Sequence, residues 1–155
     1  MRVGIFPWQR DSASQKSRDV KGTATGIVVF ARVENHGSST PLANWELTIK
    51  FPDNTVIKPQ KWPVQKTMRI PCEDGAINIS KDEYLDVKTK QALQKTGERS
   101  GVLVWMLKDL PLNTIRTKGS FYTLTARDNI GVVHALERYT LDSLPQKCFG
   151  FDFSD

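Results

Sequence analysis

Two short stretches of the chain are apolar at consecutive positions, and they restrict the fold more than any other feature. The first, Ile27–Ala31, is rich in β-branched residues and lies within the segment Thr23–Asn35. The second is Val102–Leu107. A strand that is covered on both faces needs apolar side chains at successive positions, whereas a strand with one solvated face alternates. We therefore predict that both stretches are central strands of a β-sheet.

Other segments alternate between apolar and polar residues, as strands with one buried face do. The clearest is Trp45–Phe51, which ends at the turn formers Pro52-Asp53-Asn54. Phe121–Ala126 alternates as well, and Asp128-Asn129-Ile130-Gly131 is a hairpin signal from which Val132–Leu141 runs back. These segments add at least three half-buried strands to the two central ones.

The middle of the chain is less regular. Thr55–Ile57 is expected to form a short returning strand and Ala76–Ile79 another. Lys58–Pro71 contains three prolines, which lack a backbone donor, so it is expected to form an irregular crossover or a sheet edge. Ser80-Lys81-Asp82-Glu83 has the spacing of a helix N-cap with a glutamate three residues later. We expect one or two helical turns there, with a buried side made by Tyr84, Leu85, Val87 and Leu93.

No long segment shows helical periodicity, and about seven to nine short strands are separated by turn signals. This pattern predicts an all-β fold, an antiparallel β-sandwich of about seven to nine strands with one short helix. The chain has 155 residues, of which 39% are hydrophobic, enough for one core and too few for two ordinary domains. We expect a flexible N-terminal lead-in over residues 1–22 and the sandwich over residues 23–155.

No apolar run approaches the roughly 18–20 residues of a membrane span. The run Val3–Phe6 is also shorter than the apolar core of a signal peptide, which has about 7–15 residues. We therefore expect no membrane insertion by this chain. If the protein is exported to the periplasm or the cell surface, we expect the targeting segment to lie outside this sequence.

The net charge is +5, from 22 Lys and Arg against 17 Asp and Glu. The densest basic window is Lys58–Arg69, and a second excess lies in the first 22 residues. A nucleic-acid site needs basic residues on one face or in a recognisable motif, and no finger, RNA-binding signature or basic helix is present. We interpret the charge as a solvated periphery and do not expect a nucleic-acid partner.

Several segments form one pattern, in which a strand that ends in Val-x-Asn is followed by a short loop, a second alternating strand and three later segments. The segments are Phe30-Ala31-Arg32-Val33-Glu34-Asn35-His36-Gly37, Trp45-Glu46-Leu47-Thr48-Ile49, the strand Gly101–Leu107, Lys118-Gly119-Ser120, and Leu124-x-x-x-Asp128-x-x-Gly131. Together they resemble bacterial immunoglobulin-like accessory domains of the FxLyD kind. The resemblance covers Thr23 to Leu141 and implies an immunoglobulin-like, extracytoplasmic, non-catalytic sandwich with no shared active site.

A second, shorter stretch runs from Asn35-His36-Gly37-Ser38 through Trp45 and Phe51-Pro52 to Trp62. This stretch is similar to cellulose-binding β-sandwich modules. Such a module would bind sugar rings by stacking them on exposed aromatic side chains. Trp62 and Trp8 are the candidate ligand-binding residues, because Trp45 and Trp105 lie inside strong strands and are expected in the core.

No combination of residues predicts catalysis, a cofactor or a metal. His36 lies in a turn and His134 in a strand, without a nucleophile motif beside either. The adjacent acids Glu73-Asp74 and Asp82-Glu83 suit turns and caps better than a hydrolytic cleft. Zinc binding would require Cys72 and Cys148 to converge with both histidines, without any close ligand spacing; the two cysteines either form one disulfide or remain free thiols.

The sequence therefore favours a non-catalytic interaction or accessory domain with a protein partner. The alternative that remains open is a carbohydrate-binding module that takes a polysaccharide through Trp62 and Trp8.

Overall fold

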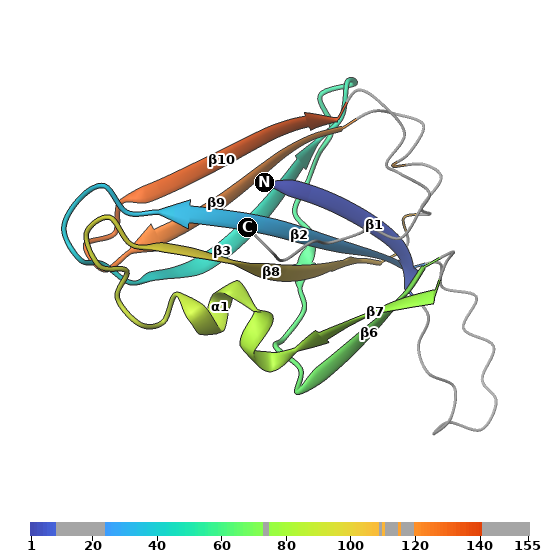
Figure 1. The fold of residues 1–155 in the computed structure, drawn as a ribbon. Coiled ribbons are helices and arrows are strands. Elements are labelled where there is room, and N and C mark those ends of the chain that lie inside the picture. Colours follow the sequence, from blue (N-terminus) through green and yellow to red (C-terminus); the bar gives the residue numbers. More distant parts are fainter. Residues whose placement is uncertain (9–23, 73–74, 109, 111–114, 116–119, 141–155) are drawn as a thin grey trace.

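The computed structural model describes residues 1–8, 24–72, 75–108, 110, 115 and 120–140, and it consists mainly of antiparallel strands (Figure 1). Two four-stranded sheets and one two-stranded hairpin hold all the named strands of this part. The helical turns named in the described residues have three and four residues. None of the described helices is long and apolar enough to cross a membrane.

The first sheet contains both stretches that are apolar at consecutive positions. Its strand order is β1-β2-β8-β5, with every pair antiparallel. β2 (Ala24–Glu34) and β8 (Glu98–Leu107) lie in the middle, and their register places Ile27 opposite Trp105. The edges are β1 (Arg2–Trp8) and the two-residue strand β5 (Gln60–Lys61).

The second sheet has the order β10-β9-β3-β4. β9 (Ser120–Asp128) and β3 (Leu42–Lys50) are its central strands. A register shift between Ala43 and Glu46 interrupts their pairing, and Asn44 adopts a positive φ of 52° there. β10 (Val133–Thr140) and β4 (Val56–Ile57) form the edges.

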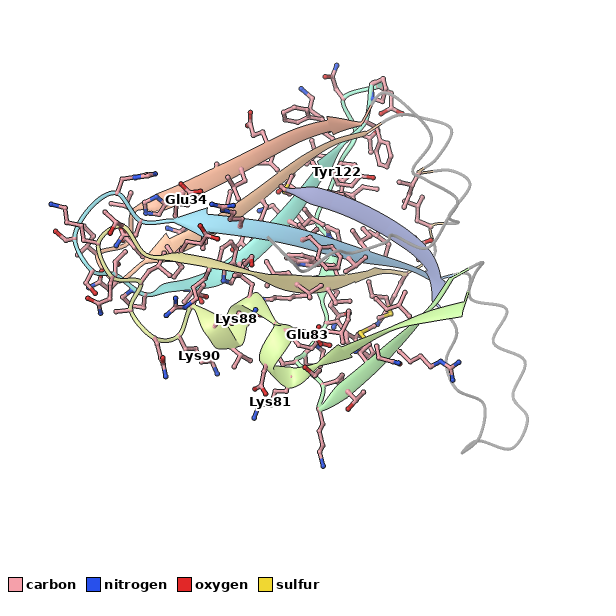
Figure 2. The ribbon with its side chains drawn as sticks, viewed as in Figure 1. Glu34, Lys81, Glu83, Lys88, Lys90 and Tyr122 are labelled. Atoms are coloured by element: carbon pink, nitrogen blue, oxygen red, sulfur yellow. The ribbon has the colours of Figure 1, made fainter. Side chains whose placement is uncertain are left out.

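The two four-stranded sheets pack face to face around one hydrophobic core. The alternating residues of β3 and β9 supply one side of this core, including Trp45 and Tyr122 (Tyr122 is labelled in Figure 2). β2 and β8 supply the other side, including Trp105. Each of these side chains is at most 4% exposed, which confirms the expectation that Trp45 and Trp105 are core residues.

A second layer covers the opposite face of β2 and β8. The hairpin of β6 (Thr67–Cys72) and β7 (Gly75–Ser80) crosses there (Figure 1). Its buried side chains and Tyr84 form a second cluster with residues of β2 and β8. β2 and β8 are apolar at consecutive positions because both of their faces are covered. The cluster comprises Val28, Met68, Ile70, Ile79, Tyr84, Val102 and Val104.

Two short helical turns follow β7, as the sequence predicted. The 3-10 helix Lys81–Glu83 (η2) begins with a capping box in which the Glu83 carboxylate accepts the Ser80 backbone N–H. α1 (Leu85–Lys88) comes directly after it. Burial also raises the pKa of the Tyr84 hydroxyl above 10.0. Tyr84, Leu85 and Leu93 are buried, and Val87 is half-buried.

The expected antiparallel, all-β class is confirmed, with two corrections of detail. The described residues form ten strands, more than the seven to nine predicted, because the proline-rich segment also contributes β5 and β6. In addition, the N-terminal lead-in predicted over residues 1–22 begins with a paired strand, β1. Val3 is apolar and only 4% exposed, so its burial in the core joins β1 to the fold. Residues 9–23 lie outside the described part.

Gly101 allows the helical turns to approach β8 closely. A Cβ atom at this position would lie 2.7 Å from the Glu83 carbonyl oxygen and 2.9 Å from the Leu85 nitrogen. Both are backbone atoms, so they cannot move aside by rotating a side chain. We predict that Gly101→Ala lowers the free energy of unfolding by about 1–3 kcal/mol in urea denaturation.

The matched control for this prediction is Gly37→Ala, in the exposed turn after β2. A Cβ atom there meets no atom closer than 3.7 Å, so stability should change little. An equal loss of stability in the two variants would show that the close approach at Gly101 is not the cause.

Candidate interaction site

The edges of the two four-stranded sheets differ in length and regularity. β4 and β5 have two residues each, and β1 contains Pro7, which has no N–H to donate. β10 has eight residues, contains no proline, and pairs with β9 without a register shift. In the described part of the chain, no strand pairs with the other side of β10. A long regular edge presents backbone donors and acceptors that another strand can bind.

We call the side of β10 that no described strand pairs with the free edge. The hydrogen bonds at the turn show which residues of β10 point their backbone groups toward it. The Asp128 N–H donates to the Val132 carbonyl at 3.1 Å, so these two residues form a hydrogen-bonded pair. Hydrogen-bonded and non-hydrogen-bonded pairs alternate along an antiparallel ladder. The backbone groups of Val133, Ala135 and Glu137 therefore point away from β9, and all three residues are exposed.

The turn that precedes β10 carries exposed apolar side chains. We call residues 128–133 the hairpin tip. Ile130 is 79% exposed, and Val132 and Val133 are 49% exposed. These are three of the four large hydrophobic residues that are exposed in the described part, the fourth being Val56 on β4. Apolar side chains gathered on a surface turn are typical of an interaction site.

Asp128 holds the hairpin tip in one conformation. Its Oδ1 accepts the backbone N–H groups of Ile130 at 3.0 Å and Val132 at 2.9 Å. Gly131 has a φ of 87°, a conformation that glycine adopts without strain, and its N–H donates to the Asp128 carbonyl. These contacts fix the backbone between the exposed apolar side chains.

His134 contacts the other oxygen of the same carboxylate. Its Nε2 lies 3.0 Å from Asp128 Oδ2. This hydrogen bond, with smaller contributions from the Val132 and Ile130 N–H groups, holds the pKa of Asp128 below its ordinary value of 3.8. The sequence pattern predicts that His134 lies in a strand, and the pairing of His134 with Asp128 depends on the hairpin register.

Neighbouring loops support the hairpin tip from one side. The Thr40 hydroxyl donates to Asn129 Oδ1 at 2.7 Å, and the Thr40 backbone forms a bridge with Leu93. The Asn35 side-chain amide donates to the Leu93 carbonyl at 2.7 Å. The loops after β2, before β8 and between β9 and β10 therefore lie at the same end of the molecule (Figure 1).

The structure does not bring the two candidate sugar-binding tryptophans together. Trp8 is the last residue of β1, at one edge of the first sheet, and its side chain is outside the described part. Trp62 directly follows β5, at the opposite edge, where its backbone N–H donates to the Val104 carbonyl at 2.8 Å. The Trp62 side chain is half-buried against the second hydrophobic cluster.

The other chemistry-bearing residues are spread over the molecule. Within the described residues, no three His, Cys, Asp or Glu side chains are placed to hold a metal ion. His36 is exposed, with Nε2 3.4 Å from Glu34 Oε2. Cys72 ends β6 with an undescribed side chain, and Cys148 lies outside the described residues, so their pairing stays untested.

Basic and acidic side chains lie together near the helical turns. Figure 2 shows Lys81 and Glu83 on η2, Lys88 at the end of α1, and Lys90 two residues later. Lys61, from the basic window of the sequence, pairs with Asp86 of α1 at 2.5 Å. The surface around α1 therefore carries both signs of charge.

No family model matches the chain, and no curated protein or solved structure matches it significantly. The geometry of β10 and the hairpin tip is what marks this surface as a candidate site. The sequence predicts the Asp128–Gly131 turn, but the exposure of its apolar side chains is seen only in the structure. The signal was present in Ile130, Val132 and Val133, which are apolar where a hairpin turn is ordinarily polar.

We predict that Asp128→Ala loosens the hairpin tip, because the Ile130 and Val132 N–H groups lose their acceptor. Amide hydrogen exchange at these two residues should become faster, while exchange in β2 and β8 stays unchanged. Asp128→Asn keeps an oxygen at the same position and should protect both amides better than Asp128→Ala does. Equal exchange rates in the two variants and the wild type would contradict the role of this side chain.

The Asp128 carboxylate also gives the fold a dependence on pH. Because the folded-state pKa lies below the unfolded value, the charged form stabilises the protein above the unfolded pKa, and this contribution is lost as the pH falls through the folded pKa. We predict that His134→Ala raises the Asp128 pKa toward 3.8 and moves this loss to higher pH. An NMR titration of the Asp128 carboxyl carbon measures the shift, and an unchanged pKa would contradict it.

Proposed function

We propose that the chain is a non-catalytic, immunoglobulin-like β-sandwich module that binds another protein through the free edge of β10 and the hairpin tip. The observation that carries the proposal is the contrast between β10 and the other sheet edges. Proteins ordinarily guard a sheet edge with short strands, proline or charge. β10 is long, regular and free of proline, and it begins at an exposed apolar turn.

Strand addition is the binding mode that fits this surface. An extended segment of a partner would pair its backbone with the outward groups of Val133, Ala135 and Glu137. The apolar side chains of the hairpin tip would bury surface at one end of the added strand, and the order imposed by Asp128 would reduce the entropy lost on binding. Pairing of this kind requires no catalytic residue.

Polysaccharide binding is the alternative, since Trp62 is partly exposed. Its support is weaker because Trp62 packs against the second hydrophobic cluster and Trp8 lies at the opposite edge of the sheet. A stacking platform needs several aromatic faces side by side.

The test of the proposed function uses the backbone of Ala135. Ala135→Pro removes one outward N–H and leaves the hydrogen bonds between β10 and β9 in place, whereas Ala135→Ser keeps that N–H. Tagged wild-type protein and both variants would be incubated with an extract of the cells that produce the protein. We expect a partner that is retained by wild type and Ala135→Ser and lost, at least tenfold, with Ala135→Pro.

Circular dichroism and thermal unfolding of Ala135→Pro establish that the variant is folded. A partner that is retained equally by Ala135→Pro would overturn the edge as the binding surface. Wild-type protein would also be incubated with insoluble polysaccharides. Clear binding that disappears in Trp62→Ala would replace the proposal with the carbohydrate-binding alternative.

A further inference from the structure

We propose that the partner of β10 is β10 of a second copy of this chain, in an antiparallel pair whose two-fold axis passes through Leu136. This inference rests on the proposed function, because it uses the same free edge and names its occupant. The two copies of the β10-β9-β3-β4 sheet would then form one continuous sheet. Two-fold dimers of this kind use the same surface on both subunits.

The symmetry of a continuous antiparallel sheet restricts the register. A two-fold axis perpendicular to the sheet keeps each face on its own side, so only residues of the same face can lie opposite each other. The axis must therefore lie where a residue faces the same residue of the second copy, and not between two successive residues of the strand. Within Val133–Thr140, axes at Leu136 and at Glu137 give the longest overlap of the two strands.

Charge distinguishes these two registers. An axis at Glu137 places this carboxylate directly opposite itself, and like charges in that position are destabilising. An axis at Leu136 places Leu136 opposite Leu136, Ala135 opposite Glu137, and Val133 opposite Tyr139. It also places Arg138 opposite His134, whose ring already contacts the Asp128 carboxylate. The register centred on Leu136 thus avoids paired carboxylates and keeps apolar residues together.

The same register satisfies the backbone groups of the free edge. The outward groups of Ala135 meet those of Glu137 of the second copy, and the outward groups of Val133 meet those of Tyr139. These become hydrogen-bonded pairs, as the alternation along β10 requires.

The assembly also closes at two copies. The opposite edge of the joined sheet is β4, which has only two residues and offers little backbone for further pairing. A second β10 is therefore a better match than an open chain of subunits, which would need two long complementary edges.

The experiment is sedimentation equilibrium of the full chain over micromolar to submillimolar concentrations. Ala135 is exposed on the outer face, so charged substitutions there do not disturb the core. Ala135→Glu puts a second carboxylate opposite Glu137 of the second copy, twice by symmetry, whereas Ala135→Lys puts an ammonium group there. Val56→Glu is the control, since Val56 is an exposed apolar residue on the far edge strand β4.

We expect wild type to form a concentration-dependent dimer. Ala135→Glu should weaken this dimer about 2- to 30-fold, from two cross-strand pairs of like charge. Ala135→Lys should leave the dimer equal to wild type or stronger, Val56→Glu should match wild type, and added salt should reduce the difference between the two Ala135 variants.

A wild-type chain that stays monomeric at every concentration would overturn the second copy as the occupant. A dimer that Ala135→Glu and Ala135→Lys weaken equally would overturn the register. Neither result decides the proposed function. A different protein that the wild type retains from the extract and that Ala135→Pro does not retain would still bind the same edge. Failure of both experiments would remove the edge as an interaction surface.

Discussion

The structure depends on the burial of β2 and β8 on both faces. On one side they meet the alternating side chains of β3 and β9, and on the other they meet the β6–β7 hairpin and Tyr84. Apolar surface removed from water contributes roughly 25 cal/mol per Å², so two faces covered along two long strands supply much of the driving force for folding. The helical turns approach β8 closely at Gly101, and Leu85 of α1 is buried in the core between the two four-stranded sheets.

This central arrangement determines where the edges lie. Since β2 and β8 occupy the middle of one sheet and β3 and β9 the middle of the other, the other two strands of each sheet lie at its edges. Three of these four edges offer few backbone groups for pairing. Two of them are strands of only two residues, and the third contains Pro7, which lacks an N–H. β10 is an edge strand because β3 and β9 occupy the middle of its sheet. It is a long and regular edge because its sequence contains no proline and it pairs with β9 without a bulge.

Local patterns predicted the central strands, the Trp45–Phe51 strand and the Ser80–Glu83 cap, because each depends on neighbouring side chains and its own turn chemistry. Strand β1 was missed because a short run such as Val3–Phe6 acquires a partner only through the register with β2, which lies far along the chain. The contact of His134 with Asp128 likewise depends on strand register, here that of β10 with β9. Residue type alone does not show that the two side chains meet, whereas the pairing of β9 with β10 does.

The candidate site combines a rigid backbone with adaptable side-chain chemistry. β10 pairs with β9 along its whole length, and Asp128 fixes the turn that leads into it, so its outward groups are ordered before any partner arrives. Backbone pairing alone would accept many extended segments, because every strand carries the same donors and acceptors. Discrimination must therefore come from side chains beside the edge. In the proposed binding mode, Glu137 would disfavour an opposing carboxylate, and Val133 with Ile130 and Val132 would favour apolar residues near the turn; together they would define the register of a bound strand.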